Sequence, residues 1–371
     1  MKHWQYQNPV AIHFGAGVLD TLPALLAGRT CTLVTFPEAE GFGLVPRLRQ
    51  LLGASLVGVI DQTQPNPDVD GLDKLYRQFW SEQQEGSAQQ SDVVVAVGGG
   101  SALDTAKALM VGTESGEFDA LVALLATGKA FKPHAVKKLI AVPTTSGTGS
   151  EVTGWATIWN RAAGKKYSLH LPETWPEAAV VDPELVLSLP AGPTLAAGLD
   201  ALSHALEAIW NINANPVSDN HAVSAAREVL ATLPKLMKNL GSVELRQRMS
   251  FAALTAGLAF SNTRTALAHS ISYDMTIHHG LPHGIACSFT LPMVLQRALG
   301  VYADRDAVLA RVFDCPLAQA PAFLTEFIEQ LGVSTQFESY GVSLTESQRM
   351  ITAALDGVRG KNFIGVARAA A

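Results

Sequence analysis

The chain has 371 residues, of which 48% are hydrophobic and 16% charged, and a formal net charge of −6; these values favour about two well-packed domains and exclude long disordered segments. The absence of a basic block argues against a nucleic-acid partner, and the absence of an apolar signal core and of any apolar run of about 18 residues predicts a soluble, cytoplasmic protein without a membrane partner. The three cysteines, at positions 31, 287 and 315, have no disulfide or zinc-ribbon spacing, which suits a reducing compartment.

The first half of the chain alternates short apolar runs with helical patterns. Strands are predicted at residues 31–36, 55–60, 92–97 and 139–142, where apolar runs are bounded by turn residues. Helices are predicted at residues 44–52 and 69–83 and from about residue 102, and a hairpin between residues 155 and 171. This alternation predicts a parallel sheet covered by helices on both faces, in a first domain of residues 1–184.

A glycine-rich turn, Gly98-Gly99-Gly100-Ser101, follows the clearest of these strands. It would place bare backbone N–H groups at a helix N-terminus, where a pyrophosphate binds. Because position 103 is Leu, the Gly-x-Gly-x-x-Gly fingerprint is missing, and a tight turn without a ligand is the alternative. A second glycine- and hydroxyl-rich run, residues 144–150, also follows a strand. It could close over the same phosphates or the nicotinamide, or be a polar surface loop.

From residue 193 onward the composition becomes rich in Ala and Leu, and strand patterns disappear. Helices are predicted at residues 193–210, 216–240, 243–260, 265–278, 293–299, 304–313, 316–331 and 346–357. The sequence therefore predicts an all-α second domain, residues 185–371. A cleft between the two domains is the expected active site.

The predicted helical domain contains a set of residues with metal-ligand chemistry: Asp200, His204, His269, His278, His279 and His283. Asp200 and His204 are four residues apart, so on a helix their side chains lie on the same face. His269 and His283 could supply a third and a fourth ligand. Carboxylate and neutral imidazole suit Fe²⁺, Zn²⁺ or Mn²⁺, whereas a single histidine on an apolar helix is more often a core residue.

Several segments resemble the iron-containing (group III) alcohol dehydrogenase family. They are Pro65-Asn66-Pro67, GGGSALDTAK at 98–107, PTTSGTGSEVT at 143–153, VVDPEL at 180–185, GLDALSHALEA at 198–208 and LPHG at 281–284. The resemblance spans essentially the whole chain. It implies a dinucleotide-binding α/β domain followed by an all-helical metal-binding domain, an architecture shared with dehydroquinate synthase. It also implies an NAD(P)-linked dehydrogenase of small alcohols and aldehydes, and dimers are common among similar proteins.

Carried over residue by residue, the family's metal ligands, for Fe²⁺ or Zn²⁺, fall on Asp200, His204, His269 and His283. Its pyrophosphate loop and further cofactor contacts fall on Gly98, Gly99, Gly100, Ser101, Asp104, Thr144, Thr145 and Thr148, although Asp104 could be structural. A bound metal would act as a Lewis acid on the substrate oxygen, and hydride transfer would be the chemistry of the nicotinamide. The resemblance leaves the other two histidines, at positions 278 and 279, outside the ligand set.

Two positions depart from the family pattern. Tyr273 stands where many members have a second histidine, four residues after His269, so a proton-relay role of that histidine does not transfer. Tyr273 could donate a hydrogen bond or fill space. Phe36 stands where many NAD-using members have an aspartate that binds the adenosine ribose. Because Glu38 and Glu40 are nearby and no arginine is, the sequence favours NAD without excluding NADP.

The segment SNTRTALAHSISY, residues 261–273, resembles a subgroup that includes phosphonoacetaldehyde reductases. Arg264 or Lys166 could bind an anionic substrate head, since Arg pairs with phosphonate or carboxylate in a bidentate way. The alternatives are an ion pair or a helix cap for Arg264 and a solvated Lys166. With Tyr273, these are the candidate catalytic-site residues for a small, anionic aldehyde. Rival functions are a maleylacetate reductase-type or dehydroquinate synthase-type enzyme and a non-catalytic nucleotide-binding protein.

Overall fold

The computed structural model describes residues 3–366, which form two compact units. Residues 9–145 and 150–186 form an α/β unit. Residues 187–366, together with residues 3–8 and 146–149, form a helical unit. The main division falls after Val186, next to the predicted position of residue 185. The sequence did not indicate that the start of the chain and the loop at 146–149 pack with the helices.

The α/β unit is built on a six-stranded parallel sheet in the order β1-β10-β7-β4-β2-β3. The strands are β1 (Ala11–Phe14), β2 (Cys31–Val34), β3 (Leu56–Ile60), β4 (Val93–Gly98), β7 (Lys138–Pro143) and β10 (Ala178–Val181). Two smaller pairs are β5 (Val111–Gly112) with β6 (Ala135–Val136), and the predicted hairpin of β8 (Trp155–Asn160) with β9 (Lys165–His170). The sheet confirms the predicted parallel architecture.

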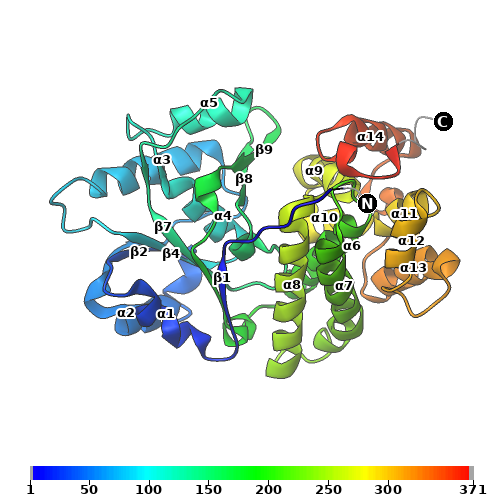
Figure 1. The fold of residues 1–371 in the computed structure, drawn as a ribbon, viewed down its shortest axis with the longest axis horizontal. Helices are drawn as coiled ribbons and strands as arrows, with labels where there is room; N and C mark the ends of the chain where they lie inside the picture. Colours follow the sequence, from blue (N-terminus) through cyan, green and yellow to red (C-terminus); the bar gives the residue numbers. More distant parts are fainter. Residues whose placement is uncertain (1–2, 367–371) are drawn as a thin grey trace. The chain divides into compact units, whose positions relative to one another are not determined.

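Helices cover both faces of this sheet (Figure 1). They are α1 (Leu22–Leu26), α2 (Leu44–Leu52), α3 (Val69–Glu82), α4 (Gly100–Leu109) and α5 (Asp119–Thr127). The central strand β4 shows why: Val93, Val95 and Val97 pack with α1 and α2 in one core, whereas Val94 and Ala96 pack with α3 and α4 in another. Successive side chains of a strand point to opposite faces, so a strand buried on both faces has to be continuously apolar.

The helical unit confirms the predicted all-α second half. Its helices are α6 (Ala191–Ile209), α7 (Pro216–Leu236), α8 (Val243–Thr263), α9 (Leu267–His279), α10 (His283–Ser288), α11 (Leu291–Ala298), α12 (Ala303–Leu309), α13 (Ala320–Gln330) and α14 (Leu344–Asp356). The long helices α6, α7 and α8 pack side by side (Figure 1). The prediction missed α10, which is one and a half turns long and too short to show a helical period.

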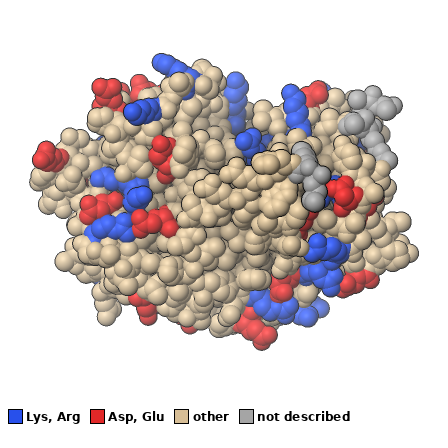
Figure 2. Space-filling model, in the orientation of Figure 1, with Lys and Arg blue, Asp and Glu red and all other residues tan. Residues whose placement is uncertain are grey.

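Charged side chains of both signs lie on the surface of the described residues. On the face drawn in Figure 2, acidic and basic side chains are interspersed, and exposed ion pairs such as Arg77 with Asp73 at 2.9 Å occur. Within residues 3–366, none of the helices has both the length and the apolarity that crossing a membrane requires.

Candidate metal centre and nucleotide-binding loop

Asp200 and His204 lie one turn apart on α6 and are both buried. Oδ1 of Asp200 is 3.8 Å from Nδ1 of His204. That same nitrogen is 3.3 Å from the carbonyl oxygen of Gly147, which favours the tautomer protonated at Nδ1 and leaves the lone pair on Nε2. Burial lowers the pKa of His204 to about 4, so the ring is neutral at pH 7, the form that binds metals.

His269, on α9, is held by a carboxylate of α6. Its Nδ1–H donates to Oε2 of Glu207 at 2.6 Å, and the fully buried Glu207 also accepts from the backbone N–H groups of Ala266 and Ala268 at 3.0 and 2.6 Å. These N–H groups belong to the start of α9, where helix donors have no partner within the helix. Glu207 therefore caps α9 and fixes the imidazole in one orientation.

This orientation turns Nε2 of His269 toward Asp200. The distance from Nε2 to Oδ1 of Asp200 is 3.4 Å, and within residues 3–366 this buried nitrogen has no hydrogen bond of normal geometry. A buried nitrogen without a hydrogen bond is uncommon. In the neutral ring that a metal requires, Nε2 carries the lone pair beside a carboxylate, which suits a metal ligand better than a core residue.

His283 and Cys287 come from α10, which packs very closely on α6. A Cβ atom at Gly284 would lie 1.9 Å from the carbonyl oxygen of Ala196, so only glycine permits this approach. The rings of His269 and His283 meet edge to face with centroids 5.5 Å apart. One turn after His283, Sγ of Cys287 lies 3.3 Å from Oδ1 of Asp200.

The structure thus brings four potential ligand atoms together, and we call them the four-atom group. They belong to Asp200, His269, His283 and Cys287 and all lie within 4.8 Å of one another. Ligands that share one ion at about 2.0–2.3 Å are themselves roughly 3–4 Å apart, and the two measured separations from Oδ1 match this value. Carboxylate, imidazole and thiol together fit Fe²⁺ or Zn²⁺.

Of the residues that the sequence proposed as ligands, His204 is outside the four-atom group, although its ring stacks on that of His269 with centroids 4.5 Å apart. The two neighbouring histidines lie elsewhere: His278 is exposed and 4.0 Å from Asp274, and His279 is 3.8 Å from Glu346.

Sequence reasoning missed two residues of this centre, Glu207 and Cys287. Glu207 lies three positions after His204 on α6, and Cys287 lies four positions after His283 on α10. Both spacings put the pair on one helix face. The spacing argument that linked Asp200 to His204 would therefore have found Glu207, whereas for Cys287 it requires α10, which the sequence did not reveal.

The glycine turn lies between β4 and α4 in the α/β unit. The helix begins at Gly100 with Gly99 as its N-cap, two residues earlier than predicted, so the turn itself forms the helix N-terminus. A Cβ atom at Gly98 would lie 2.6 Å from Cβ of Ala102. The hydroxyl of Ser101 accepts a hydrogen bond from the backbone N–H of Asn66 at 3.1 Å, which links the Pro-Asn-Pro motif to the turn.

Thr144 and Thr145 follow β7, the neighbour of β4, so both loops leave the same edge of the sheet. The N–H of Thr144 donates to the carbonyl oxygen of Gly98 at 2.9 Å. In open α/β sheets ligands bind outside the carboxyl ends of the strands. Thr148 instead belongs to the helical unit with residues 146–149, where a Cβ atom on Gly147 would lie 2.6 Å from the carbonyl oxygen of Ala197.

Asp104 has a structural environment. Its Oδ1 accepts from the hydroxyl of Ser150 and its Oδ2 from the N–H of Thr157, both at 2.8 Å. Lys107, one turn later and fully buried, donates to the carbonyl oxygens of Ser150 and Trp155 at 2.6 and 2.7 Å. These bonds tie α4 to the start of the hairpin and account for Asp104 without a cofactor.

The three candidate catalytic-site residues occupy different places. Tyr273 lies on α9 one turn after His269, with the guanidinium carbon of Arg359 5.2 Å from its ring centroid. Arg264 is exposed and is the C-cap of α8. Lys166 is in the α/β unit on β9, where its Nζ lies 5.3 Å from the ring centroid of Trp159. Arg264 and Tyr273 thus share the unit of the four-atom group, and Lys166 does not.

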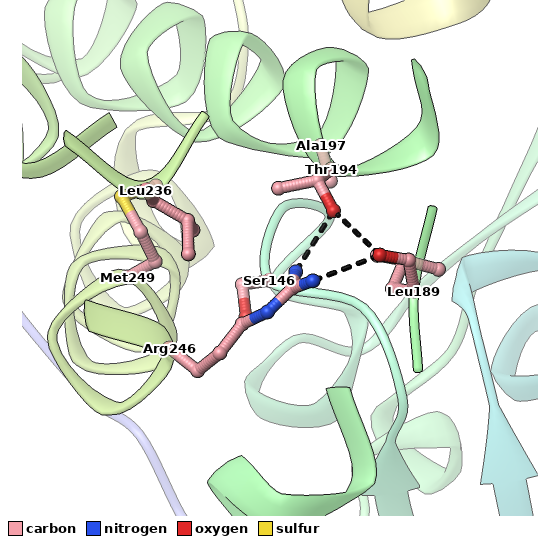
Figure 3. A pocket seen from close by; sticks show the side chains of 7 residues that line it. All are labelled: Ser146, Leu189, Thr194, Ala197, Leu236, Arg246 and Met249. Atoms are coloured by element: carbon pink, nitrogen blue, oxygen red, sulfur yellow. Dashed lines mark hydrogen bonds between the residues drawn. The ribbon is translucent and has the colours of Figure 1, made fainter. Parts of the chain in front are cut away.

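A small pocket in the helical unit lies at the N-terminal part of α6 and contains none of the predicted site residues (Figure 3). Its buried Arg246 donates to Oγ1 of Thr194 and to the carbonyl oxygen of Leu189, both at 2.8 Å. Ser146 contributes a hydroxyl that lies 2.9 Å from that of Ser250. The guanidinium thereby fixes the segment that leads into α6, the helix that carries Asp200.

Comparison with known proteins agrees with this arrangement. Residues 9–183 match the model of iron-containing alcohol dehydrogenases, and residues 194–370 match the C-terminal model of the same family. The NAD-dependent methanol dehydrogenase of Bacillus methanolicus is 35% identical over 261 residues, which cover 69% of this chain and 64% of that enzyme, just under two thirds of its length. The 1-propanol dehydrogenase PduQ of Salmonella typhimurium is 33% identical over 313 residues, 82% of this chain and 78% of that enzyme.

A solved structure matches along the full length. The sulfoacetaldehyde reductase from Bifidobacterium kashiwanohense in complex with NAD⁺ superposes with a TM-score of 0.89 at 27% identity, over 100% of this chain and 98% of that one. The two family models match the two halves of the chain in order. The chain therefore belongs to the iron-containing alcohol dehydrogenase family, a family of NAD-linked, metal-using oxidoreductases.

Proposed function

We propose that this chain is a metal-dependent reductase that uses a nicotinamide cofactor to convert a small aldehyde with an anionic head group, phosphonate or sulfonate, into its alcohol. The buried four-atom group, in a member of this family, carries the proposal. A divalent ion would supply a Lewis acid for the substrate oxygen, and the nicotinamide would supply the hydride.

The residues around the centre have separable tasks. Asp200 contributes a negative charge, since its neighbouring imidazoles outweigh burial and hold its pKa below the usual range. Glu207 orients His269 and increases the basicity of its free nitrogen, as carboxylates bonded to ligand histidines do. Gly147 does the same for His204 through its carbonyl oxygen. We assign His204 as a further ligand through Nε2 on this ground.

Arg264 is our candidate for the head-group cation. Its backbone, at φ 67° and ψ 172°, occupies a region that glycine almost alone adopts, at a cost of about 1–3 kcal/mol. The strained peptide is held because its N–H donates to the carbonyl oxygen of Phe260 at 2.8 Å and its own carbonyl oxygen accepts from Nδ2 of Asn211 at 3.1 Å. Glycine would adopt this conformation without strain, yet the position, five residues before His269, is occupied by arginine. This supports a function for the Arg264 side chain.

The substrate class has two further supports. The segment around Arg264 resembles phosphonoacetaldehyde reductases, and the full-length structural match acts on sulfoacetaldehyde according to its name. Both compounds are two-carbon aldehydes with a tetrahedral anionic head. A guanidinium binds such a head through two parallel hydrogen bonds.

Steady-state kinetics test this function. Protein loaded with Fe²⁺ or Zn²⁺ is assayed for NADH and NADPH oxidation with phosphonoacetaldehyde, sulfoacetaldehyde and the uncharged propanal. We expect kcat/KM to be about tenfold or more higher for the anionic aldehydes, the value of one charge-assisted hydrogen bond. Equal kcat/KM for propanal would refute the head-group assignment.

Two other outcomes would change the reaction class. Full activity after the metal has been removed would indicate a maleylacetate reductase-type enzyme. A stoichiometrically bound metal without oxidation of either cofactor by any aldehyde or alcohol would indicate a dehydroquinate synthase-type enzyme.

A further inference from the structure

Cys287 is in the four-atom group, although the family resemblance gives it no role. Its side chain is completely buried. Its Sγ donates a hydrogen bond to Oδ1 of Asp200 at 3.3 Å, a separation close to the 3.4 Å between the same oxygen and Nε2 of His269. By distance from the shared carboxylate, the sulfur is at least as well placed as Nε2 of His269.

The position of this sulfur is fixed by its surroundings. The carbonyl oxygen of Cys287 accepts from the hydroxyl of Ser203 on α6 at 2.8 Å, and Gly284 holds the preceding turn against Ala196. Cys287 is also one turn after His283, so the two side chains share a face of α10. The short helix that the sequence did not reveal therefore presents two donors, nitrogen and sulfur, to one place.

We propose that Sγ of Cys287 is a ligand of the ion held by Asp200, His269 and His283. This ligation rests on the proposed function, because it requires a divalent ion at the four-atom group. When the sulfur binds, the S–H bond breaks, a metal–sulfur bond forms and the proton passes to solvent. A thiolate added to the carboxylate and imidazole ligands makes the whole set softer, so it favours Zn²⁺ over Mn²⁺.

Cobalt spectroscopy of the full-length protein tests the ligation directly, without an activity assay. Metal-free protein is titrated with Co²⁺ and its ultraviolet and visible spectra are recorded. Sulfur ligation produces an intense sulfur-to-cobalt charge-transfer band, which nitrogen and oxygen ligands do not produce. We expect this band in the wild type and in Cys31→Ser, a control at an equally buried cysteine of the α/β unit.

In Cys287→Ser the band should disappear while weaker ligand-field bands remain, and Zn²⁺ affinity should fall by at least ~10-fold. If this variant fails to fold, X-ray absorption of the Zn²⁺-loaded wild type gives the same answer, since a sulfur scatterer at about 2.3 Å is expected. Stoichiometric Co²⁺ without a charge-transfer band, or zinc with only nitrogen and oxygen neighbours, would overturn the ligation and leave the proposed function standing. Failure to bind Co²⁺ or Zn²⁺ at all would overturn both.

Discussion

Oε2 of Glu207 lies 2.6 Å from Nδ1 of His269, and the same carboxylate accepts from the backbone N–H groups that begin α9. One buried side chain of α6 thus fixes both the start of α9 and the imidazole that faces Asp200. Although burial would raise the pKa of Glu207, the charge and hydrogen bonds of its partners hold it below the usual range. Glu207 therefore stays ionised at neutral pH.

Replacing Glu207 by Gln should weaken metal binding by about 10–100-fold, the usual effect of losing the carboxylate behind a ligand histidine. The amide has one acceptor oxygen, so it cannot serve all four donors, which include the backbone N–H of His269 at 3.3 Å, and its NH₂ group would face a backbone N–H. Competition of Zn²⁺ with a chelating dye measures the affinity, with Glu177→Gln in the α/β unit as the control. Unchanged affinity would show that Glu207 only caps the helix.

Two residues of the metal centre, Glu207 and Cys287, were not predicted from the sequence. Asp200 and His204 were found because their spacing was examined on one helix, whereas Glu207 on the same face was not tested as a partner. Cys287 was considered only for disulfide and zinc-ribbon spacings. Its pairing with His283 depends on α10, and six residues are too few to reveal a helical period. The position of Glu207 was readable from its spacing on a predicted helix, whereas the position of Cys287 becomes informative only once α10 is known.

Other features require tertiary structure. Strands β4 and β7 were predictable because burial on both faces demands a continuous apolar run, whereas β1, at the edge, has exposed or half-buried residues and no such run. Helix α5 was missed because Leu121 is its only residue that is buried. The backbone conformation of Arg264 is held in part by Asn211, which is 53 residues away in the chain, and no local pattern predicts this contact.

Arg264→Gly and Arg264→Ala should separate strain from substrate binding. Glycine adopts φ 67° and ψ 172° freely, so Arg264→Gly should increase the free energy of unfolding by about 1 kcal/mol, whereas Arg264→Ala retains the strain and should give no gain. Urea denaturation measures this difference. Both variants should lower kcat/KM for anionic aldehydes by about tenfold or more and leave the value for propanal nearly unchanged. An equal loss with propanal would contradict a head-group role.

Tyr273 should act as a neutral phenol throughout the working pH range. Burial raises its pKa to about 12, against the opposing effect of Arg359. The hydroxyl can therefore donate a hydrogen bond below that pH but cannot accept a proton as a base. The pH profile of kcat/KM should keep its shape in Tyr273→Phe, and Tyr273→His should add an inflection at or below about 6.5, the ordinary pKa of histidine, because burial lowers it. Loss of a neutral inflection in Tyr273→Phe would instead identify Tyr273 as a relay.

Glu151→Gln should change the pH dependence of stability in the α/β unit. Burial raises the pKa of Glu151 from 4.5 to about 7, so between these values the folded state retains a proton that the unfolded state releases. The wild type therefore loses stability as pH rises through this window, by up to about 3 kcal/mol for a shift of this size. The glutamine mimics the protonated acid, so the variant should match the wild type near pH 4.5 and be more stable at pH 7.

Lys107 supplies the matching test above neutral pH. Burial lowers its pKa from 10.5 to about 8, so between pH 8 and 10.5 the unfolded state holds the extra proton and stability should rise with pH. The contribution of Glu151 and Lys107 to the free energy of unfolding should therefore be lowest between pH 7 and 8, where both side chains are charged. Urea unfolding of the wild type, followed by the fluorescence of the tryptophans of this unit, measures it. Lys107→Met should lose the rise above pH 8 and retain the fall below pH 7. A stability difference between Glu151→Gln and the wild type that does not vary with pH would show that folding leaves the pKa of Glu151 unchanged.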